Sequence, residues 1–368
     1  MVETYLGFWE RLSRPVIGLS PMDGVTDFAC RYISALHGGP AVIFTEFTTA
    51  EGLFHAPQII LRDFEYNEIE RPIVAQIYGS NPDDFYRAAH VVCELGFDGI
   101  DINMGCPSKT VVRKNCGAKL ITVPDLAVEI IRATKQGVID WSRGQTLGDL
   151  KIPAQLIRTI CQMNMKRTGN PGAVTKTPIP FSIKTRIGYD TVVIESWIET
   201  LLAESPAAIS IHGRTLKQMY RGAADWEAIA KAKEIARHAT TLIFGNGDIQ
   251  SLAQALERIQ ASGVDGTLIG RSAIGNPWIF KNSAPTREEK IKVALEHALY
   301  FRKTRPEARW ESLKKHLVGY LRSFPDAVNF RRSIVTTKSF EEVVRLLRAG
   351  RGSPSGLDRE EPKTDQGH

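Results

Sequence analysis

The amino-acid sequence predicts an α/β fold, a (β/α)8 or TIM barrel, followed by a small all-helical domain. Short apolar runs of the β type alternate with amphipathic helical stretches eight times between residues 15 and 280, and this alternation is typical of parallel strands. The length of that region fits the roughly 250 residues of such a barrel. No β-type run follows residue 285, and helical patterns continue alone.

The eight runs expected to be strands are short and bounded by turn residues. They are residues 16–19, 41–44, 73–77, 99–102, 181–184, 208–211, 241–244 and 266–269. The competing arrangement is an open doubly wound sheet, which usually has a Gly-rich dinucleotide turn after its first strand. The segment that follows the first run here, Ser20-Pro21-Met22-Asp23-Gly24, contains no such turn. The closed barrel is therefore favoured.

Amphipathic segments between the runs predict helices at residues 82–95, 125–134, 195–203, 226–237 and 249–261. Residues 137–178 interrupt the alternation and are too long for a simple connection. They contain a possible helix at 154–166 and join the fourth helix to the fifth strand. We therefore expect this insert on the amino-terminal face of the barrel, without a catalytic role.

The pattern changes near residue 285. Helices are expected at residues 288–303, 308–324 and 339–347, with 329–337 as a connection. This gives a barrel domain at 1–283, a helical domain at 284–349 and a tail at 350–368 that we expect to be disordered, because it is polar and rich in Gly and Pro. Residues 281–350 carry 16 Lys and Arg against 8 Asp and Glu. That excess indicates either a polyanionic partner or a solvated helical surface.

The bulk composition excludes several classes of protein. Hydrophobic content of 43% and charged content of 24% are ordinary for a globular chain. No apolar run approaches the ~18 residues that span a membrane, and the first residues lack the apolar core of a signal peptide. Five cysteines without CxxC spacing predict neither a disulfide framework nor a metal site. The expected location is the cytoplasm, with a monomer as the default state.

Polar and unusual residues gather where the predicted strands end. In a (β/α)8 barrel the carboxyl ends of all strands meet at one rim, where active sites lie. The residues in question are Pro21, Met22, Gln76, Asn103, Cys106, Lys184, Arg186, His212, Arg214, Asn246, Asp248, Gly270 and Arg271. We expect them to form one site.

Cys106 is the candidate reactive thiol. It follows an apolar strand in the segment Asp101-Ile102-Asn103-Met104-Gly105-Cys106-Pro107, where a turn at Gly105 presents it on a loop. Cys30 and Cys93 instead lie inside apolar runs and are expected to be packing residues. Exposure and a polarised environment decide whether a thiol reacts, so the loop position favours a functional role for Cys106.

Two glycine-containing loops after late strands predict a phosphate site. They are Gly245-Asn246-Gly247-Asp248 and Gly270-Arg271, and both precede helical segments whose backbone amides can bind phosphate. Flavin mononucleotide, a phosphate joined to a large planar ring, fits such a rim; the alternative is that the glycines only make tight turns. Lys184 is expected near the flavin pyrimidine, and His212 has either a structural or a cofactor role.

These motifs together resemble the signature series of the tRNA-dihydrouridine synthases. The matching segments keep their order and spacing over residues of about 15–345, and they begin at Pro21, Asn103, Lys184, His212, Gly245 and Gly270. The resemblance implies an FMN-bearing barrel with a helical tRNA-binding domain. It implies an oxidoreductase acting on a CH–CH group, in which NADPH reduces FMN and the flavin passes a hydride from N5 to C6 of a tRNA uracil.

The resemblance also implies residue roles. Cys106 is expected to protonate C5 as the general acid, and Asn103, Lys184 and Arg186 are expected to hold the uracil. The expected flavin contacts are Pro21, Met22, Gln76, Lys184, His212, Asn246, Gly247, Asp248, Gly270 and Arg271. The expected tRNA contacts in the helical domain are Arg302, Lys303, Lys314, Lys315, Arg322, Arg331 and Arg332.

The chain departs from the family pattern in places. Cys116 is not expected in the loop after Cys106, and we interpret it as a packing residue rather than a second functional thiol. Ser20 replaces a more usual alanine, and the 137–178 insert has no assigned counterpart. Two alternatives remain: another FMN barrel reductase that acts on a free pyrimidine or an enone, and a non-catalytic RNA-binding protein on a retained barrel.

Overall fold

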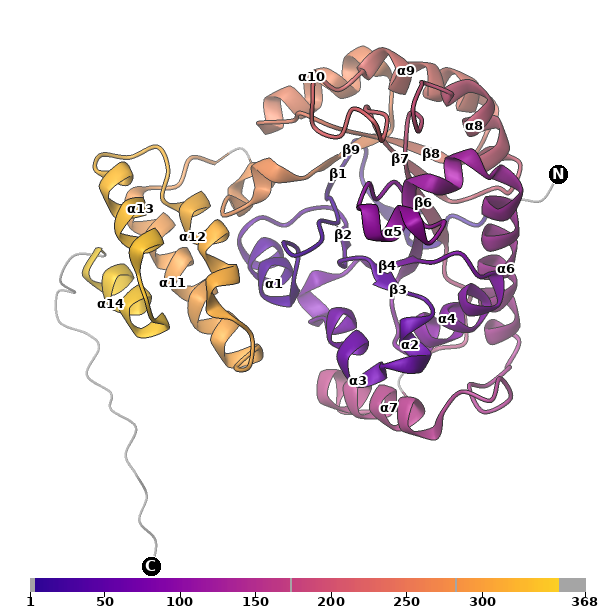
Figure 1. Ribbon diagram of the computed structural model, residues 1–368, viewed down its shortest axis with the longest axis horizontal. Helices are drawn as coiled ribbons and strands as arrows, with labels where there is room; N and C mark the ends of the chain where they lie inside the picture. The colour runs from indigo at the N-terminus through magenta and orange to yellow at the C-terminus, as the bar shows by residue number, and fades with distance from the viewer. Residues whose placement is uncertain (1–3, 173, 282, 351–368) are drawn as a thin grey trace, which may run out of the picture. The chain divides into compact units, whose positions relative to one another are not determined.

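A computed structural model describes residues 4–172, 174–281 and 283–350. Within this part of the chain, eight parallel strands form a closed barrel in which each strand pairs with the next and β2 closes the circle onto β4 (Figure 1). The strands are β1 (Val16–Leu19), β2 (Ile43–Phe44), β4 (Ile73–Tyr78), β5 (Gly99–Met104), β6 (Phe181–Arg186), β7 (Ala208–His212), β8 (Leu242–Asn246) and β9 (Gly266–Ile269). The predicted fold class is confirmed. The short strand β3 (Thr48–Thr49) pairs with the end of β4.

Helices surround the strands on the outside of the barrel (Figure 1). The longer ones are α1 (Phe28–His37), α4 (Pro82–Glu94), α6 (Pro124–Ser142), α8 (Ile194–Leu202), α9 (Trp226–Ile235) and α10 (Leu252–Ser262). Short α-helical turns are α2 (Gly52–His55), α3 (Pro57–Ile60) and α5 (Lys109–Arg113). The 3-10 turns are η1 (Gly7–Arg11), η2 (Leu61–Phe64), η3 (Glu68–Glu70), η4 (Gly117–Thr122), η5 (Ala236–His238), η6 (Arg271–Ala273) and η7 (Pro277–Phe280).

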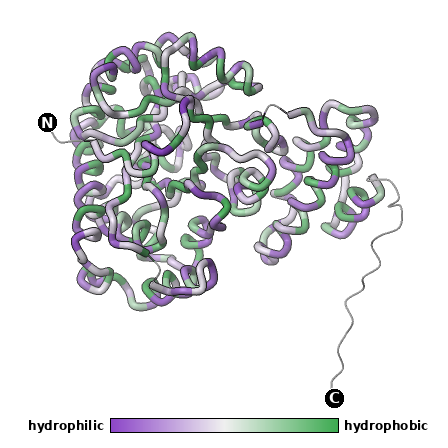
Figure 2. The backbone as a smooth tube through the Cα atoms, turned by 180° about the vertical axis from the view of Figure 1, so that it is seen from behind, coloured by the Kyte–Doolittle hydropathy of each residue, from purple (hydrophilic) through white to green (hydrophobic). Residues whose placement is uncertain are grey.

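Among the predicted helices of the barrel, two boundaries differ from the structure by three residues or more, each for a local reason. The helix expected from residue 249 begins at Leu252, because the side chain of Ser251 accepts the backbone N–H of Gln254 at 3.1 Å and caps that end. The helix expected to end at residue 134 continues as α6, since Val138 and Trp141 keep its buried face apolar. The alternation of hydrophobic and hydrophilic residues along the helices is visible in Figure 2.

The strands separate two apolar layers because their side chains alternate between the two faces. Side chains such as Ile77, Ile102 and Ile183 belong to the larger core, together with the buried faces of the surrounding helices. The opposite face of the strands contributes to a second cluster that also contains Phe8 and Trp9 of η1. The amino-terminal turn thus packs against the inner face of the barrel. Nearer the carboxyl ends of the strands, the inner face carries polar side chains such as Gln76, Asp101 and Ser182.

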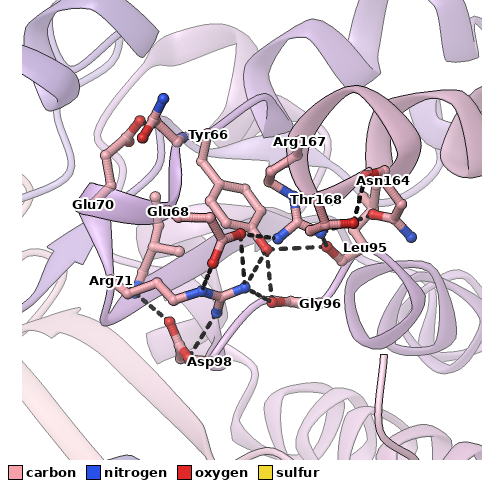
Figure 3. A network of polar contacts seen from close by, with 12 residues as sticks. Tyr66, Glu68, Glu70, Arg71, Leu95, Gly96, Asp98, Asn164, Arg167 and Thr168 are labelled. Atoms are coloured by element: carbon pink, nitrogen blue, oxygen red, sulfur yellow. Dashed lines mark hydrogen bonds and ion pairs between the residues drawn. The ribbon is translucent and has the colours of Figure 1, made fainter. Parts of the chain in front are cut away.

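Within the described residues of the predicted insert, the end of α6 is followed by a separate helix, α7 (Ala154–Thr168), which ends at Gly169 in the left-handed conformation that glycine favours. Figure 3 shows how it is anchored. Arg167 donates to the carbonyl oxygen of Leu95 at 2.7 Å, pairs with Glu68, and lies over the ring of Tyr66 at 4.2 Å. These partners precede β4 and β5, so α7 lies at the amino-terminal ends of the strands.

The chain divides into two compact units, Met1–Ser283 and the residues from Ala284 onward. The second unit contains α11 (Arg287–Thr304), η8 (Trp310–Leu313), α12 (Lys314–Tyr320), α13 (Ala327–Thr336) and α14 (Phe340–Gly350). The expectation of a connection at 329–337 is wrong, because Ala327 and Ile334 bury one face of a helix there. The helix expected to reach residue 324 ends at Tyr320, ahead of positive φ angles at Ser323 and Asp326. From residue 351 the predicted tail lies outside the described residues.

Candidate active site

Strand register brings the predicted rim residues together at the carboxyl ends of the barrel strands. Asn103 of β5 is aligned with Lys184 of β6. Two residues further along β6, Arg186 is aligned with His212 of β7, which in turn is aligned with Asn246 of β8. Since alternate residues of a strand share a face, these side chains lie next to one another at one end of the barrel.

The loop that carries Cys106 is fixed by hydrogen bonds on both sides. The side-chain oxygen of Asn103 accepts the backbone N–H groups of Gly105 at 3.1 Å and Cys106 at 2.8 Å. The Nε of Arg186 donates to the carbonyl oxygen of Gly105 at 2.7 Å, and the backbone N–H of Ala118 donates to the carbonyl of Cys106 at 3.1 Å. The position of the thiol is therefore set by the neighbouring strand and by η4.

The Cys106 thiol is less accessible than its loop position suggested, with only 8% of the residue exposed. Burial raises its pKa, and the nearby Asp23 carboxylate acts in the same direction, while a backbone hydrogen bond from Ser108 and the cations Arg186 and Lys184 oppose it. A raised pKa keeps the thiol protonated at neutral pH. That state suits a proton donor better than a nucleophile, which must be a thiolate.

Cys116 packs beside the candidate acid. It belongs with Cys106 and Val111 to a small buried cluster, and its Sγ donates to the carbonyl oxygen of Lys114 at 3.2 Å. The next residue, Gly117, has φ +62°, and a Cβ there would lie 2.8 Å from the carbonyl oxygen of Cys106. The close approach of the two loops therefore requires glycine. Cys30 and Cys93 are buried elsewhere, as expected.

Two cations lie close to the thiol, half-buried Lys184 and buried Arg186. Burial lowers the pKa of Lys184 to about 8, assisted by the positive charge of Arg186 and opposed by Asp101. Its Nζ donates to the side-chain oxygen of Asn246 at 3.4 Å. Burial also lowers the pKa of Arg186 to about 10. Both groups carry a positive charge at neutral pH and are available to stabilise an anion that forms at the barrel mouth.

His212 is neutral in this environment. Burial, together with the positive charges of Arg186, Lys184 and Arg214, lowers its pKa to about 2. The Nη1 of Arg214 lies 3.3 Å from Nε2 of His212. A guanidinium can only donate, so Nε2 is the acceptor and the ring proton is assigned to Nδ1. His212 can therefore donate a hydrogen bond to a ligand without carrying charge.

The predicted phosphate loop after β8 has an unusual backbone. Gly247 has φ +134°, and its carbonyl oxygen accepts the indole N–H of Trp226 at 3.1 Å. A Cβ on Gly245 would lie 2.3 Å from the ring of Trp226, so only glycine lets this indole pack beneath the loop. Asp248 follows with φ +54°. The loop geometry thus depends on Trp226, which the sequence analysis did not single out as a site residue.

The Asp248 carboxylate does not itself suit a phosphate, which it would repel. It accepts from the backbone N–H of Ala224 at 2.8 Å and pairs with Arg214 at 2.5 Å and Arg271 at 3.1 Å. Arg271 is 60% exposed, whereas Arg214 is buried and its Nε has no hydrogen-bond partner in the described part of the chain. Asp248 therefore orients two arginines, of which Arg214 was noted from the sequence but given no role.

The remaining predicted flavin contacts also lie at the strand ends. The backbone N–H of Met22 donates to the hydroxyl of Thr26 at 2.9 Å, which fixes the turn after β1 that also contains Pro21. A Cβ on Gly270 would lie 3.5 Å from the sulfur of Met22 and meets little else, so the backbone after β9 is open to a ligand. The exposed guanidinium of Arg271 and the open backbone at Gly270 fit a flavin phosphate.

Gln76 reaches the site through a residue that the sequence interpretation missed. Its Nε2 donates to a carboxylate oxygen of Asp101 at 2.7 Å, and its Oε1 accepts from Nδ2 of Asn103 at 2.9 Å. Ser182 donates to the other Asp101 oxygen at 2.5 Å. A carboxylate two residues before Asn103 on the same strand face was a usable signal, because such a position faces the barrel interior.

The cations expected to contact tRNA differ in their surroundings within the helical unit. Lys314 donates to the carbonyl oxygens of Val335 and Thr337, and Arg331 to that of Leu321. Arg302 donates to the carbonyl of Pro306 and lies over the ring of Phe340 at 4.6 Å. The exposed members of the predicted set are Lys303, Lys315, Arg322 and Arg332.

Comparison with known proteins identifies relatives along most of the chain. The model of the dihydrouridine synthase family matches residues 18–140 and 171–350. The chain is 32% identical over 349 residues to a probable tRNA-dihydrouridine synthase of Staphylococcus aureus, covering 92% of this chain and 94% of that protein. It is 32% identical over 351 residues to probable tRNA-dihydrouridine synthase 2 of Bacillus subtilis, covering 92% and 95%.

Among solved structures, the chain is similar to DHODH of Eimeria tenella, solved in complex with ferulenol. The two share 12% sequence identity with a TM-score of 0.48, over 76% of this chain and 83% of that chain. The family match omits residues 141–170, a gap that contains α7 (Ala154–Thr168). No described helix is long and apolar enough to cross a membrane.

Proposed function

The chain belongs to the dihydrouridine synthase family, and from this membership we propose that it reduces specific uridines of tRNA to 5,6-dihydrouridine, with FMN as bound cofactor and NADPH as reductant. The observation that carries the proposal is the juxtaposition of a buried, protonated thiol with half-buried Lys184 and buried Arg186. Cys106, Lys184 and Arg186 supply the proton and the positive charge that reduction of a conjugated enone requires.

The strand-end residues described above would hold the flavin. The exposed guanidinium of Arg271 and the backbone around Gly247 and Gly270 suit its phosphate. Gln76 and neutral His212 are the expected contacts of its polar ring edge. When bound, the reduced flavin supplies a hydride for C6 of the uracil.

The residues of the chain perform the complementary step. Cys106 donates its Sγ proton to C5, so that the C5=C6 bond gains one hydrogen at each carbon. Negative charge develops on O4 as the hydride arrives, and Lys184 and Arg186 stabilise it in a site from which water is largely excluded. Asn103 holds the Cys106 loop by accepting two backbone N–H groups.

The substrate must be presented as an unstacked base. A uridine inside folded tRNA reaches the mouth of a barrel only if it leaves its stacked position, and tRNA is grasped by its shape and backbone. We propose that the helical unit supplies the backbone contacts through Lys303, Lys315, Arg322 and Arg332. Lys314, Arg331 and Arg302, also expected as contacts, have their charged groups at carbonyl oxygens of their own unit.

Mass spectrometry of nucleosides tests the proposal. Unmodified tRNA is incubated with the purified protein and NADPH, and uridine is examined for the gain of two hydrogens. We expect the gain with the unchanged protein, its loss with Cys106→Ala, and its retention with the matched control Cys116→Ala. A yellow protein that oxidises NADPH but leaves tRNA unchanged would instead favour a reductase of free pyrimidines or enones. A protein without flavin would favour a non-catalytic RNA-binding role.

A further inference from the structure

We propose that Asp101 is a positioning residue for the proton donor. In this interpretation its carboxylate sets the direction of a chain of hydrogen bonds that runs through Gln76 and Asn103 and ends at the backbone of Cys106. The inference rests on the proposed function in so far as Cys106 is the acid. It assigns a role to Asp101, for which the sequence analysis expected none.

The chain of hydrogen bonds is continuous and follows from strand register. Gln76, Asp101 and Ser182 are aligned across β4, β5 and β6. Ser182 donates to one oxygen of Asp101 at 2.5 Å, and Gln76 donates to the other at 2.7 Å. From Gln76 the chain passes to Asn103 at 2.9 Å and from Asn103 to the N–H of Cys106 at 2.8 Å.

The charge on Asp101 makes the chain run in one direction only. A carboxylate accepts and cannot donate, so the amide of Gln76 must turn its NH2 group toward Asp101 and its oxygen toward Asn103. Asn103 must then turn its NH2 group toward Gln76, which leaves its oxygen for the backbone N–H groups. Reversal of either amide would set the NH2 group of Asn103 against the N–H groups of Gly105 and Cys106, and the loop would lose both bonds.

The surroundings show why the carboxylate has few other partners. Asp101 is fully buried, and the inner-face cluster that contains Val74 and Phe244 is apolar. Burial raises its pKa to about 6, opposed by the bonds from Ser182 and Gln76 and by the charge of Lys184. Removing Asp101 alone would leave the buried donors of Ser182 and Gln76 without an acceptor, and this costs stability whatever the carboxylate does for the Cys106 loop. A contribution to loop geometry, rather than to stability, therefore separates this proposal from a packing role.

An exchange of partners provides a direct test. Gln76→Glu places two carboxylates face to face and should break the chain. Adding Asp101→Asn to that variant restores every bond, because the new amide can accept from Ser182 and donate to position 76, which still accepts from Asn103. We expect Gln76→Glu to lower kcat about 100-fold, the loss typical of a misplaced reacting group. The double variant should recover at least about 10-fold of that loss.

Thiol accessibility gives a readout that does not need tRNA reduction. The rate of Cys106 alkylation by iodoacetamide is followed by peptide mass spectrometry in the flavin-loaded protein, with buried Cys93 as the internal reference. At a temperature well below its unfolding midpoint, Asp101→Leu should speed alkylation of Cys106 about fivefold, the effect of one lost hydrogen bond. Alkylation still reports on the position of the Cys106 loop if the protein proves inactive on tRNA. The proposed reduction of tRNA and the proposed role of Asp101 can therefore fail independently.

Ser182→Ala is the matched control, because it removes the bond on the side of Asp101 away from Gln76. The alkylation rate and kcat of this variant should stay within about threefold of those of the unchanged protein, which is less than the effect of losing one hydrogen bond to the Cys106 loop. The proposal is overturned if the double variant is no more active than Gln76→Glu. It is also overturned if Asp101→Leu folds and leaves both alkylation and kcat unchanged. If Asp101→Leu does not fold, the comparison of kcat between Gln76→Glu and the double variant still tests the proposal.

Discussion

The guanidinium of Arg186 donates from Nε to the carbonyl oxygen of Gly105, the residue before the candidate acid Cys106, over 2.7 Å. The same side chain donates from Nη1 to the carbonyl of Thr215 at 3.3 Å. Arg186 thus joins the loop after β5 to the loop after β7. The uracil-binding role that the family resemblance implies for Arg186 would thus be combined with a role in holding the loop of the candidate proton donor.

Arg186→Lys should therefore impair the enzyme although the charge is retained. A lysine is a single point donor and cannot bond both carbonyl oxygens as the planar guanidinium does. We expect kcat/KM for tRNA to fall about 100-fold, mainly through kcat. Steady-state kinetics with dihydrouridine detection measures this, with the exposed Arg158→Lys of α7 as control. Unchanged kinetics in Arg186→Lys would show that charge alone is required.

The alkaline limit of the reaction should belong to Lys184. Its pKa is lowered to about 8 by burial and by Arg186, so its charge is present below that pH and is lost as the pH rises above it. Cys106, whose pKa is raised from 9.0, loses its proton only at higher pH. We expect kcat/KM to fall about tenfold per pH unit above pH 8.

Lys184→Arg provides the control for this assignment. The guanidinium keeps its charge, and so the alkaline limb should move upward by at least about one pH unit, to where the thiol titrates, even if the maximal rate is lower. A pH–rate profile from about pH 6 to 10 measures both limbs. An alkaline limb at the same pH in the two proteins would assign it to another group.

His212 should make the folded barrel sensitive to acid. Its pKa is lowered from 6.5 to about 2 in the folded protein, so only the unfolded chain takes up its proton as the pH falls below 6.5. Stability linked to this group is complete above pH 6.5 and decreases as the pH falls toward 2. Between about pH 7 and pH 5.5 the unchanged protein should lose about 1 kcal/mol more than His212→Asn. Urea unfolding at both pH values measures the difference, and equal losses would contradict it.

The exposed cations of the helical unit should dominate the salt dependence of tRNA binding. Each phosphate contact contributes about −0.7 to −0.9 to the slope of log affinity against log salt. Replacing Lys303, Lys315, Arg322 and Arg332 by Gln should therefore flatten the slope by about 3 and weaken binding. Filter binding at several salt concentrations measures this. The control replaces Arg158 and Lys166 of α7 by Gln and should leave the slope nearly unchanged. An equal effect in the control would indicate nonspecific electrostatic attraction of tRNA to the protein.

The sequence was sufficient for the barrel because hydrophobic alternation marks each strand independently of the others. It was also sufficient to place Cys106, Lys184 and His212 at the same rim of the barrel. The carboxyl ends of the strands meet at this rim whatever the register between them. The sequence could not show that Asp101 contacts Gln76, because that contact depends on the register between β4 and β5, which is set by pairing across the barrel. The burial of Cys106 was missed for a similar reason, as η4 covers the loop from a later part of the chain.

Gly245 offers a final test of how the cofactor loop is built. A methyl group there would lie 2.3 Å from the Trp226 ring, so the indole must move and its 3.1 Å bond to the carbonyl of Gly247 is lost. Gly245→Ala should therefore weaken flavin retention about tenfold or more, because the phosphate loop loses its support. Flavin fluorescence on dilution measures the dissociation constant. Gly148→Ala, whose nearest neighbour would be Thr146 at 3.6 Å, should bind flavin normally; unchanged retention in Gly245→Ala would mean that the loop does not hold the phosphate.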